Sequence, residues 1–336
     1  MKLKMGWLVL ILVLAVAVIL FSFTQGRYPL SLGDIAAYLN HLLHGAGPDP
    51  VQDRTAVLLL DIRLPRILAA LAVGAALSVS GATFQAMFVN PLVSPGLLGV
   101  LAGASFGAAL AMVFSSRWIV VQASAFGFGV LAVLLSLLLS RMYKGDRLLL
   151  LILSVVISGA LFTALLSIVK YLADPYDQLP AIIYWLMGGF SLVDTPTVMA
   201  LIPGIAVGIV INILLAKYLN VLTMGEEEAQ SMGLRVRELR LIFIVTATLI
   251  SSLTVAIGGI IGWVGLVIPH MGRMLVGPDN RVLLPCCALL GGLYLLVVDN
   301  VSRQLFPVEV PLGILTALLG IPVFALVLRM ARKGWG

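Results

Sequence analysis

The sequence predicts an all-α, polytopic membrane protein with about ten transmembrane helices and both termini in the cytoplasm. Of the 336 residues, 61% are hydrophobic and 11% are charged, whereas charged residues make up about 25% of a typical soluble domain. Long apolar runs recur along the chain with short polar breaks between them. Lysine and arginine are concentrated in alternate breaks, which is the asymmetry expected of a protein that crosses the membrane many times.

The apolar runs divide into ten segments. We place them at residues 5–23, 66–88, 96–114, 119–139, 148–171, 198–216, 241–257, 258–269, 282–301 and 310–328. Most are long enough to cross a hydrocarbon core of about 30 Å at about 1.5 Å per helical residue. The eighth is too short to do so alone, so we expect a broken or tilted helix there. The first follows Lys2 and Lys4 and exceeds the apolar core of a signal peptide, so we expect an uncleaved helix.

The placement of positive charge predicts the orientation. With the N-terminus inside, 14 of the 21 lysines and arginines lie on the cytoplasmic side and 7 lie outside. Because ten is an even number, the C-terminus is also expected inside. Three stretches are long enough to do more than connect helices: residues 25–61 and 173–196 outside, and residues 218–240 inside. An apolar patch at residues 182–187 predicts a short interfacial helix in the second outer stretch.

Motifs that the sequence lacks exclude several classes of protein. There is no G-x-x-x-x-G-K-[ST] phosphate loop, so we do not expect the chain itself to bind ATP. His41, His44 and His270 do not form a ligand set, and we predict neither a metal site nor a catalytic centre. The net charge of +6 reflects topology and does not indicate nucleic-acid binding. Cys286 and Cys287 are neighbours inside an apolar run and are predicted to be buried.

Ionisable groups are scarce inside the predicted spans. Ion-coupled transporters usually keep carboxylates near the middle of the membrane, whereas Asp299 and Glu309 fall near the ends of predicted helices. The energy for transport is therefore expected to come from a partner protein. An ion-coupled secondary transporter is the alternative from another class.

The inner stretch contains an acidic segment that begins at Glu226. Three glutamates at a helix start suit the positive end of the helix dipole, and Gly233 suits a helix end. We therefore predict a short exposed helix followed by a basic piece. It is either an ordinary solvated loop or a docking helix for a cytoplasmic motor domain.

Two arginines, Arg63 and Arg66, lie on the outer side at the predicted start of the second helix, where Pro65 suits a first helical turn. Both oppose the positive-inside trend, and Arg66 also opposes the helix dipole. This pattern favours an acidic partner outside; the alternative is that the side chains extend toward lipid headgroups. Arg303 also lies outside. It either meets the same external partner or forms an i,i+4 ion pair with Asp299.

Glycine and proline are dense at residues 90–99 and 258–270. Non-helical backbone at membrane depth is tolerated only where protein buries it or water reaches it. These two stretches are candidate parts of a pathway or gate, although close helix contacts explain part of the pattern.

Seven stretches together resemble the FecCD family of type II ABC importer permeases. They occur in the family's order over nearly the whole chain: IRLPRI (62–67), SGATFQAMFVNPLVSPGLLGV (80–100), YWLMGGF (184–190), MGEEEAQSMGL (224–234), GLVIPHMGR (265–273), RVLLP (281–285) and EVPLGILTALLGIPVF (309–324). Such a set is far more specific than any single motif.

The resemblance implies that residues 1–336 form one permease domain, a translocation subunit without enzymatic activity in a prokaryotic inner membrane. It implies a homodimer around a central pathway, two ATPase subunits inside and a periplasmic or surface-tethered substrate-binding protein outside. Residues 218–240 would hold cytoplasmic coupling helices, and residues 25–61 and 173–196 would be periplasmic. ATP and magnesium would bind the ATPase subunits, and this chain would bind no cofactor.

The resemblance also implies roles for individual residues. Those that would contact the ATPase are Glu226, Glu227, Glu228, Ala229, Met232 and Gly233. Those that would pair with glutamates of the binding protein are Arg63, Arg66 and Arg303. Those of the cytoplasmic gate would be Asn90, Pro91, Leu92, Gly145 and Asp146. Those that would line the pathway are Ser154, Ser158, Thr163, Ser167 and Thr316.

The substrate is predicted only as a class. Members of the resembled family carry ferric siderophores, haem, cobalamin, and molybdate or tungstate. The outer stretch Asp174–Pro180 resembles members for iron complexes and for oxyanions alike. We expect an iron complex, a siderophore or haem, because such substrates are the most frequent in the family. Molybdate or tungstate is the second candidate, which an outward-facing ring of cations would suit, and cobalamin is a further alternative.

Overall fold

The computed structural model describes residues 2–26, 28–44, 50–142 and 147–331. Within them the secondary structure is entirely helical. The elements are α1 (Lys2–Thr24), α2 (Leu32–His44), α3 (Pro50–Ala56), η1 (Val57–Arg63), α4 (Leu64–Met87), η2 (Pro95–Leu98), α5 (Val100–Phe114), α6 (Trp118–Met142), α7 (Arg147–Leu172), α8 (Gln178–Leu186), α9 (Thr195–Leu214), α10 (Ala216–Leu222), α11 (Glu226–Ser231), α12 (Val236–Gly258), α13 (Val264–Val276), α14 (Asn280–Gln304) and α15 (Leu312–Ala331).

The apolar helices follow the order of the ten predicted segments. Over the described ranges, six are long and apolar enough to cross a membrane; they lie in α3–α4, α6, α7, α9, α12 and α14. Shorter apolar helices occur in α1, α5, α13 and α15. The all-helical, multi-pass architecture is therefore confirmed, whereas ten crossings and a cytoplasmic location of the termini remain predictions.

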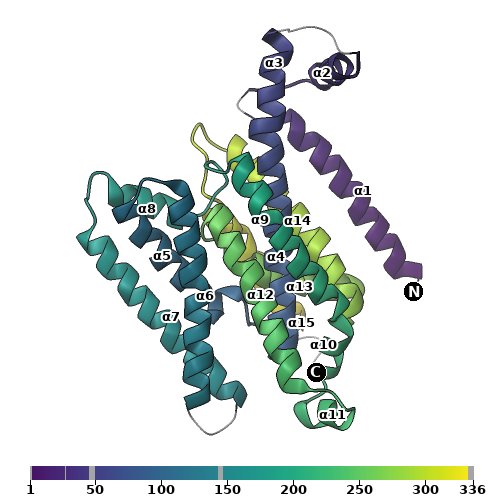
Figure 1. Ribbon diagram of the computed structural model, residues 1–336. Coiled ribbons are helices and arrows are strands. Elements are labelled where there is room, and N and C mark those ends of the chain that lie inside the picture. The colour runs from purple at the N-terminus through teal and green to yellow at the C-terminus, as the bar shows by residue number, and fades with distance from the viewer. Residues whose placement is uncertain (1, 27, 45–49, 143–146, 332–336) are drawn as a thin grey trace.

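The helices define two ends of the molecule. Figure 1 shows the start of α1 and the end of α15 directed toward the side that carries α11, whereas α2, α3 and α8 lie toward the other side. This arrangement agrees with the predicted grouping of the inner and outer stretches. We call the side of α11 the inner side and the side of α2, α3 and α8 the outer side.

The second predicted span starts earlier than expected. The chain is helical without interruption from Val51 to Met87, and residues 57–63 form a turn of π-helix within it. The Leu64 N–H accordingly bonds the carbonyl of Leu59, five residues back. This shift of register lets Pro65, which lacks an N–H, occupy the first turn of α4 without breaking the helix. The predicted helix start at residue 66 is wrong, because the π-helix accommodates the proline.

α4 lies in the middle of the bundle and is buried along almost its whole length (Figure 1). It contacts α14, α12, α13 and α9. Glycines allow two of these contacts, since a Cβ on Gly74 would lie 2.1 Å from the Gly291 carbonyl oxygen and one on Gly81 would lie 2.0 Å from that of Gly265. Small residues of this kind let transmembrane helices approach closely. α5, α6 and α7 pack against one another on another side of the bundle.

The chain leaves the helical conformation between α12 and α13. Gly259 has φ of 66° and ψ of −151°, a conformation open only to glycine, and Trp263 has a positive φ of 66°. The break is held by neighbours: the Gly189 N–H donates to the Gly258 carbonyl at 2.8 Å, and the Leu312 N–H donates to the Gly188 carbonyl at 2.9 Å.

The eighth predicted segment is therefore short, as expected, but begins at Val264 rather than residue 258. Its 13 residues extend over only about 20 Å, less than a membrane core of about 30 Å. The glycine- and proline-rich stretch 258–270 thus provides the non-helical backbone that the sequence predicted. Cys286 and Cys287 are fully buried in α14, as predicted.

Candidate functional site

An ionic cluster lies at the outer end of α4. The Arg66 guanidinium donates from Nε to both oxygens of Asp299 at 3.0 Å and from Nη2 to Asp299 Oδ1 at 2.9 Å. It also donates to Glu309 from Nη1 at 3.1 Å and from Nη2 at 2.9 Å. The Asp299 side chain is fully buried and that of Glu309 is 22% exposed. Arg66 thereby joins α4 to α14 and to the connection that precedes α15.

The other two outer arginines complete this cluster. Arg303 Nε lies 3.3 Å from Asp299 Oδ2, so the i,i+4 ion pair that was the alternative for Arg303 is present. Its Nη1 donates to the carbonyl of Gln25 at 3.2 Å. Arg63, which is 4% exposed, donates to the backbone carbonyls of Phe23 in the last turn of α1 and of Tyr28 in the connection to α2.

The partners of Arg66 differ from the expected ones. An acidic partner was expected outside the chain, but the partners of Arg66 are Asp299 and Glu309 of the chain itself. Sequence reasoning missed this pairing because 233 and 243 residues separate Arg66 from these carboxylates. A role of these arginines in docking a partner protein remains a prediction.

A pocket lies beside the ionic cluster. Arg66, Glu309 and Ser302 form one part of its wall, and Trp118, Tyr184, Trp185 and residues 188–192 form another. Since the loop at 188–190 also holds the break after α12, the pocket connects the outer cluster with the non-helical backbone.

On the inner side, a tight turn follows α4. Val89 has a positive φ of 47°, and Asn90, Pro91 and Leu92 are exposed. The Asn90 N–H donates to the Gln85 carbonyl at 3.1 Å, and Asn90 Oδ1 accepts from the Leu92 N–H at 2.9 Å. The other two predicted gate residues, Gly145 and Asp146, lie outside the described residues.

The Gln85 side chain links this turn to α13. It is 3% exposed, its Nε2 donates to the Gly265 carbonyl at 3.3 Å, and its Oε1 accepts a hydrogen bond from Arg273 Nη2. We call these contacts the Gln85–Arg273 bracket. Neither residue has a role predicted from the sequence, although both lie in stretches that resemble the family. A glutamine within an apolar run is the signal that indicates such a contact.

The predicted pathway residues divide into two groups. Ser154, Ser158 and Thr316 are buried within the chain, and Ser158 Oγ donates to the Ala132 carbonyl of α6 at 2.8 Å. Their predicted role as lining residues stays a prediction. Thr163 and Ser167, one helical turn apart, are exposed on α7 and bond only to carbonyls of their own helix.

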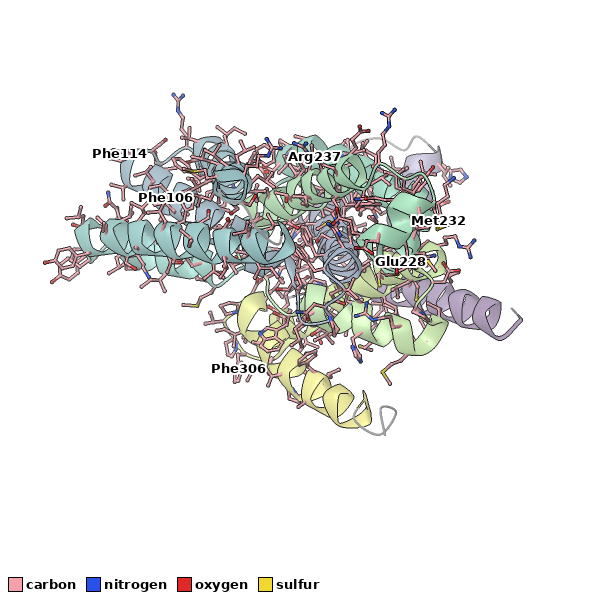
Figure 2. The ribbon with its side chains drawn as sticks, turned by 90° about the horizontal axis from the view of Figure 1, so that it is seen from below. Phe106, Phe114, Glu228, Met232, Arg237 and Phe306 are labelled. Atoms are coloured by element: carbon pink, nitrogen blue, oxygen red, sulfur yellow. The ribbon has the colours of Figure 1, made fainter. Side chains whose placement is uncertain are left out.

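The predicted acidic helix on the inner side is confirmed as α11. The Glu226 carboxylate pairs with Arg240 of α12 at 2.7 Å, and Ala229 is fully buried. Gly233, with φ of 78°, provides the left-handed turn after the helix. The remaining predicted coupling residues are exposed: Glu227, Glu228 and Met232. Figure 2, seen from below, shows Glu228 and Met232 near one another at this end of the molecule.

These features define a class: a multi-pass helical membrane protein with interrupted backbone between two helices and an exposed acidic helix on one side. The chain belongs to the FecCD transport family, whose model matches residues 12–330. It is a permease subunit of a type II ABC importer, in which a separate subunit hydrolyses ATP.

Curated relatives extend over most of the chain. It is 39% identical over 335 residues to the molybdate import system permease protein MolB of Haemophilus influenzae, covering 99% of this chain and 97% of the relative. It is 38% identical over 286 residues to the hemin transport system permease protein HmuU of Yersinia pestis, covering 82% of this chain and 85% of that relative. A solved structure described as an inward-facing, metal-chelate type ABC transporter matches with a TM-score of 0.85 and 38% identity, covering 98% of this chain and 99% of that one.

Proposed function

We propose that two copies of this chain form the translocation pathway of an importer in a prokaryotic inner membrane. Two ATPase subunits would bind on the inner side, and a substrate-binding protein would bind on the outer side. The observation that carries the proposal is α11, an exposed acidic helix at the inner end of a chain that lacks a phosphate loop.

The placement of α11 suits transmission of force. Glu227, Glu228 and Met232 are open to a partner, whereas Ala229 is buried and Glu226 is tied to Arg240. A force on the exposed face would therefore act on α12, which runs from α11 to the break at Gly259. ATP would drive transport because its affinity differs between two states of the complex.

The turn at Asn90–Leu92 is proposed as part of the cytoplasmic gate, together with Gly145 and Asp146 of the α6–α7 connection. η2, which follows the turn, contacts α7. Thr163 and Ser167 are the proposed lining residues of the pathway, because they are exposed on α7.

On the outer side, Arg63, Arg66 and Arg303 are the proposed docking residues. Because Asp299 and Glu309 already pair with Arg66, glutamates of a binding protein would compete with carboxylates of this chain. Docking would then depend on salt.

For the substrate, we propose an iron complex, a siderophore or haem. Relatives named as iron chelatin and hemin permeases support this choice. Exposed apolar side chains of α7, among them Val156, Ile157, Leu161 and Ile168, suit a chelate with an organic surface. The second candidate is molybdate or tungstate, favoured by the relative MolB, whose match covers 99% of this chain. Cobalamin is a weaker alternative, supported by the cobalamin and vitamin B12 permeases among the relatives.

The coupling proposal is tested by co-purification from the native membrane. Glu227→Arg combined with Glu228→Arg is expected to abolish retention of the ATPase subunit, because it reverses two exposed charges of α11. Glu238→Arg is the matched control, since Glu238 is an exposed glutamate on the same side but outside α11. Retention and transport activity of the double variant at the level of this control would refute the role of α11.

The substrate is tested on the binding protein. Ferric siderophore, haem, cobalamin, molybdate and tungstate are titrated separately, and the ligand that binds is then tested for uptake into proteoliposomes that contain the whole complex and ATP. Uptake of molybdate or tungstate alone would refute an iron complex. ATP-independent uptake by this chain alone, driven by an ion gradient, would refute the importer.

A further inference from the structure

The outer helix α2 has an apolar surface that the rest of the chain covers only in part. Tyr38, 7% exposed, packs with Leu30 and Leu59, and Ile35 and Phe23 lie against this group. Leu32, Leu39, Leu42 and Leu43 are nevertheless 70%, 53%, 58% and 83% exposed. These leucines are therefore not required for contacts within the described chain.

Three of the exposed leucines form a stripe along α2. Leu32, Leu39 and Leu43 are spaced seven and four residues apart, which places them on one face of an α-helix. Asp34 and His41 lie on the opposite face, because 100° of rotation per residue separates them from the stripe by about half a turn. α2 thus has the division into polar and apolar faces that is typical of helices at a membrane surface.

The start of α2 is fixed in place by hydrogen bonds. The Ser31 N–H and hydroxyl both donate to Asp34 Oδ2 at 2.8 Å, and the Asp34 N–H donates to Ser31 Oγ at 3.1 Å. This reciprocal capping satisfies donors at the helix start. It stabilises the helix that presents the stripe.

The position of α2 indicates what covers the stripe. Figure 1 shows α2 beside α3, just beyond the upper end of α1, and α2 contacts α3. Phe23 of the last turn of α1 belongs to the cluster under Tyr38. Leu20 and Phe21 of the same helix end are 58% and 53% exposed, so the apolar surface of α1 continues toward α2.

The same view argues against a second copy of the chain as the partner of the stripe. α1 and α2 lie at one side of the molecule, and α7 lies at the other (Figure 1). A second copy that shared a pathway along α7 would therefore be remote from α2. The stripe itself also carries no charged residue that could pair with a protein partner.

We propose that α2 lies on the outer surface of the lipid bilayer and inserts Leu32, Leu39 and Leu43 at the boundary between headgroups and acyl chains. The polar face with Asp34 and His41 would remain in water. α2 would thereby anchor the outer end of α1, and through Arg63 the outer end of α4, at the membrane surface. This proposal requires that the chain span a membrane, but it does not depend on the substrate or on the partners proposed above.

The test uses an environment-sensitive fluorophore on single cysteines in lipid nanodiscs of phosphatidylcholine and phosphatidylglycerol. Leu39→Cys and Leu43→Cys report on the stripe. Ala37→Cys is the matched control, because Ala37 is exposed on the same helix two residues from Leu39 and faces the other way. Cys286 and Cys287 are fully buried, and the unmutated protein measures any background labelling.

Labels at positions 39 and 43 are expected to emit at shorter wavelength than the label at 37. They should also be quenched several-fold more strongly by lipids that carry a nitroxide near the headgroup, and less by aqueous iodide. Equal iodide quenching at 37 and 39 without quenching by nitroxide lipid would overturn the proposal. Shielding of positions 39 and 43 that requires the binding protein would also overturn the proposal, because it identifies a protein partner. Shielding that persists without lipid and rises with protein concentration would overturn it as well, because it identifies a second copy.

Discussion

Arg66 on α4 and Asp299 on α14 form a bidentate ion pair that is almost wholly removed from solvent. The two residues are 233 positions apart in the chain. Burial of either charge alone would be costly, and the pair is tolerated because nearly every donor of Arg66 meets a carboxylate oxygen. Glu309 supplies the second carboxylate and Arg303 the second guanidinium. The cluster therefore fixes the outer ends of α4 and α14 relative to the connection that precedes α15.

We predict that Asp299→Asn destabilises the protein by about 3 kcal/mol, because it removes one partner of a buried pair while Glu309 still holds Arg66. The measurement is thermal unfolding of the purified chain in detergent. Glu238→Gln is the control, since its pair with Arg235 is exposed and such pairs contribute little. Equal unfolding temperatures of the two variants would show that the buried pair has no role in stability.

If a binding protein docks on Arg66, a substitution of Glu309 is expected to strengthen the docking. Glu309→Gln removes the carboxylate that competes for Arg66, so the affinity for the binding protein is expected to rise several-fold at low salt and to fall back toward that of the parent at high salt. Surface plasmon resonance on complexes in nanodiscs measures this. Asp61→Asn, which removes an exposed carboxylate nearby in η1, serves as the charge-matched control. An affinity that falls, or that rises equally in the control, would contradict competition for Arg66.

The Gln85–Arg273 bracket predicts a defect in coupling. Gln85→Leu leaves Arg273 without its amide acceptor and removes the bond from Nε2 to the Gly265 carbonyl, so this side chain no longer ties the end of α4, where the turn begins, to α13. We expect ATP hydrolysis to continue while transport per ATP falls several-fold, because the proposed gate is no longer positioned by α13. Gln85→Glu keeps the acceptor for Arg273 but loses the donor to Gly265, so it is expected to restore coupling in part. The rates of ATP hydrolysis and of transport are measured in proteoliposomes. An equal loss of transport per ATP in the two variants would indicate a purely structural role.

Close contact between α4 and α14 predicts a strict requirement for glycine at position 74. A Cβ there would lie 2.1 Å from the Gly291 carbonyl oxygen, so the helices must separate in Gly74→Ala. We expect a loss of about 1–3 kcal/mol of stability, as in other overpacked interiors. Gly127→Ala on α6 is the control, because nothing lies within 4 Å of a Cβ at that position. Thermal unfolding curves that coincide for the two variants would contradict the contact.

The succession of apolar helices could be predicted from the sequence because each apolar run is a local property of the chain. The short α11 could be predicted for the same reason, since three glutamates and a following glycine define its ends locally. The start of the helix that contains α4 was misplaced at residue 66 because a proline normally indicates a helix boundary. The π-helix that accommodates Pro65 covers Val57–Arg63, and neither hydropathy nor a capping residue indicates its shift of register.

The sequence by itself determined the class of this protein. Its recurring apolar runs require lipid as solvent, and its ordered series of motifs defines the family. Only the tertiary structure decided which polar side chains meet. Arg66 pairs with Asp299, Gln85 with Arg273, and Ser158 turns toward α6. The physical reason is range, because hydropathy and helix capping act over neighbouring residues, whereas ion pairs and buried hydrogen bonds depend on which helices lie side by side.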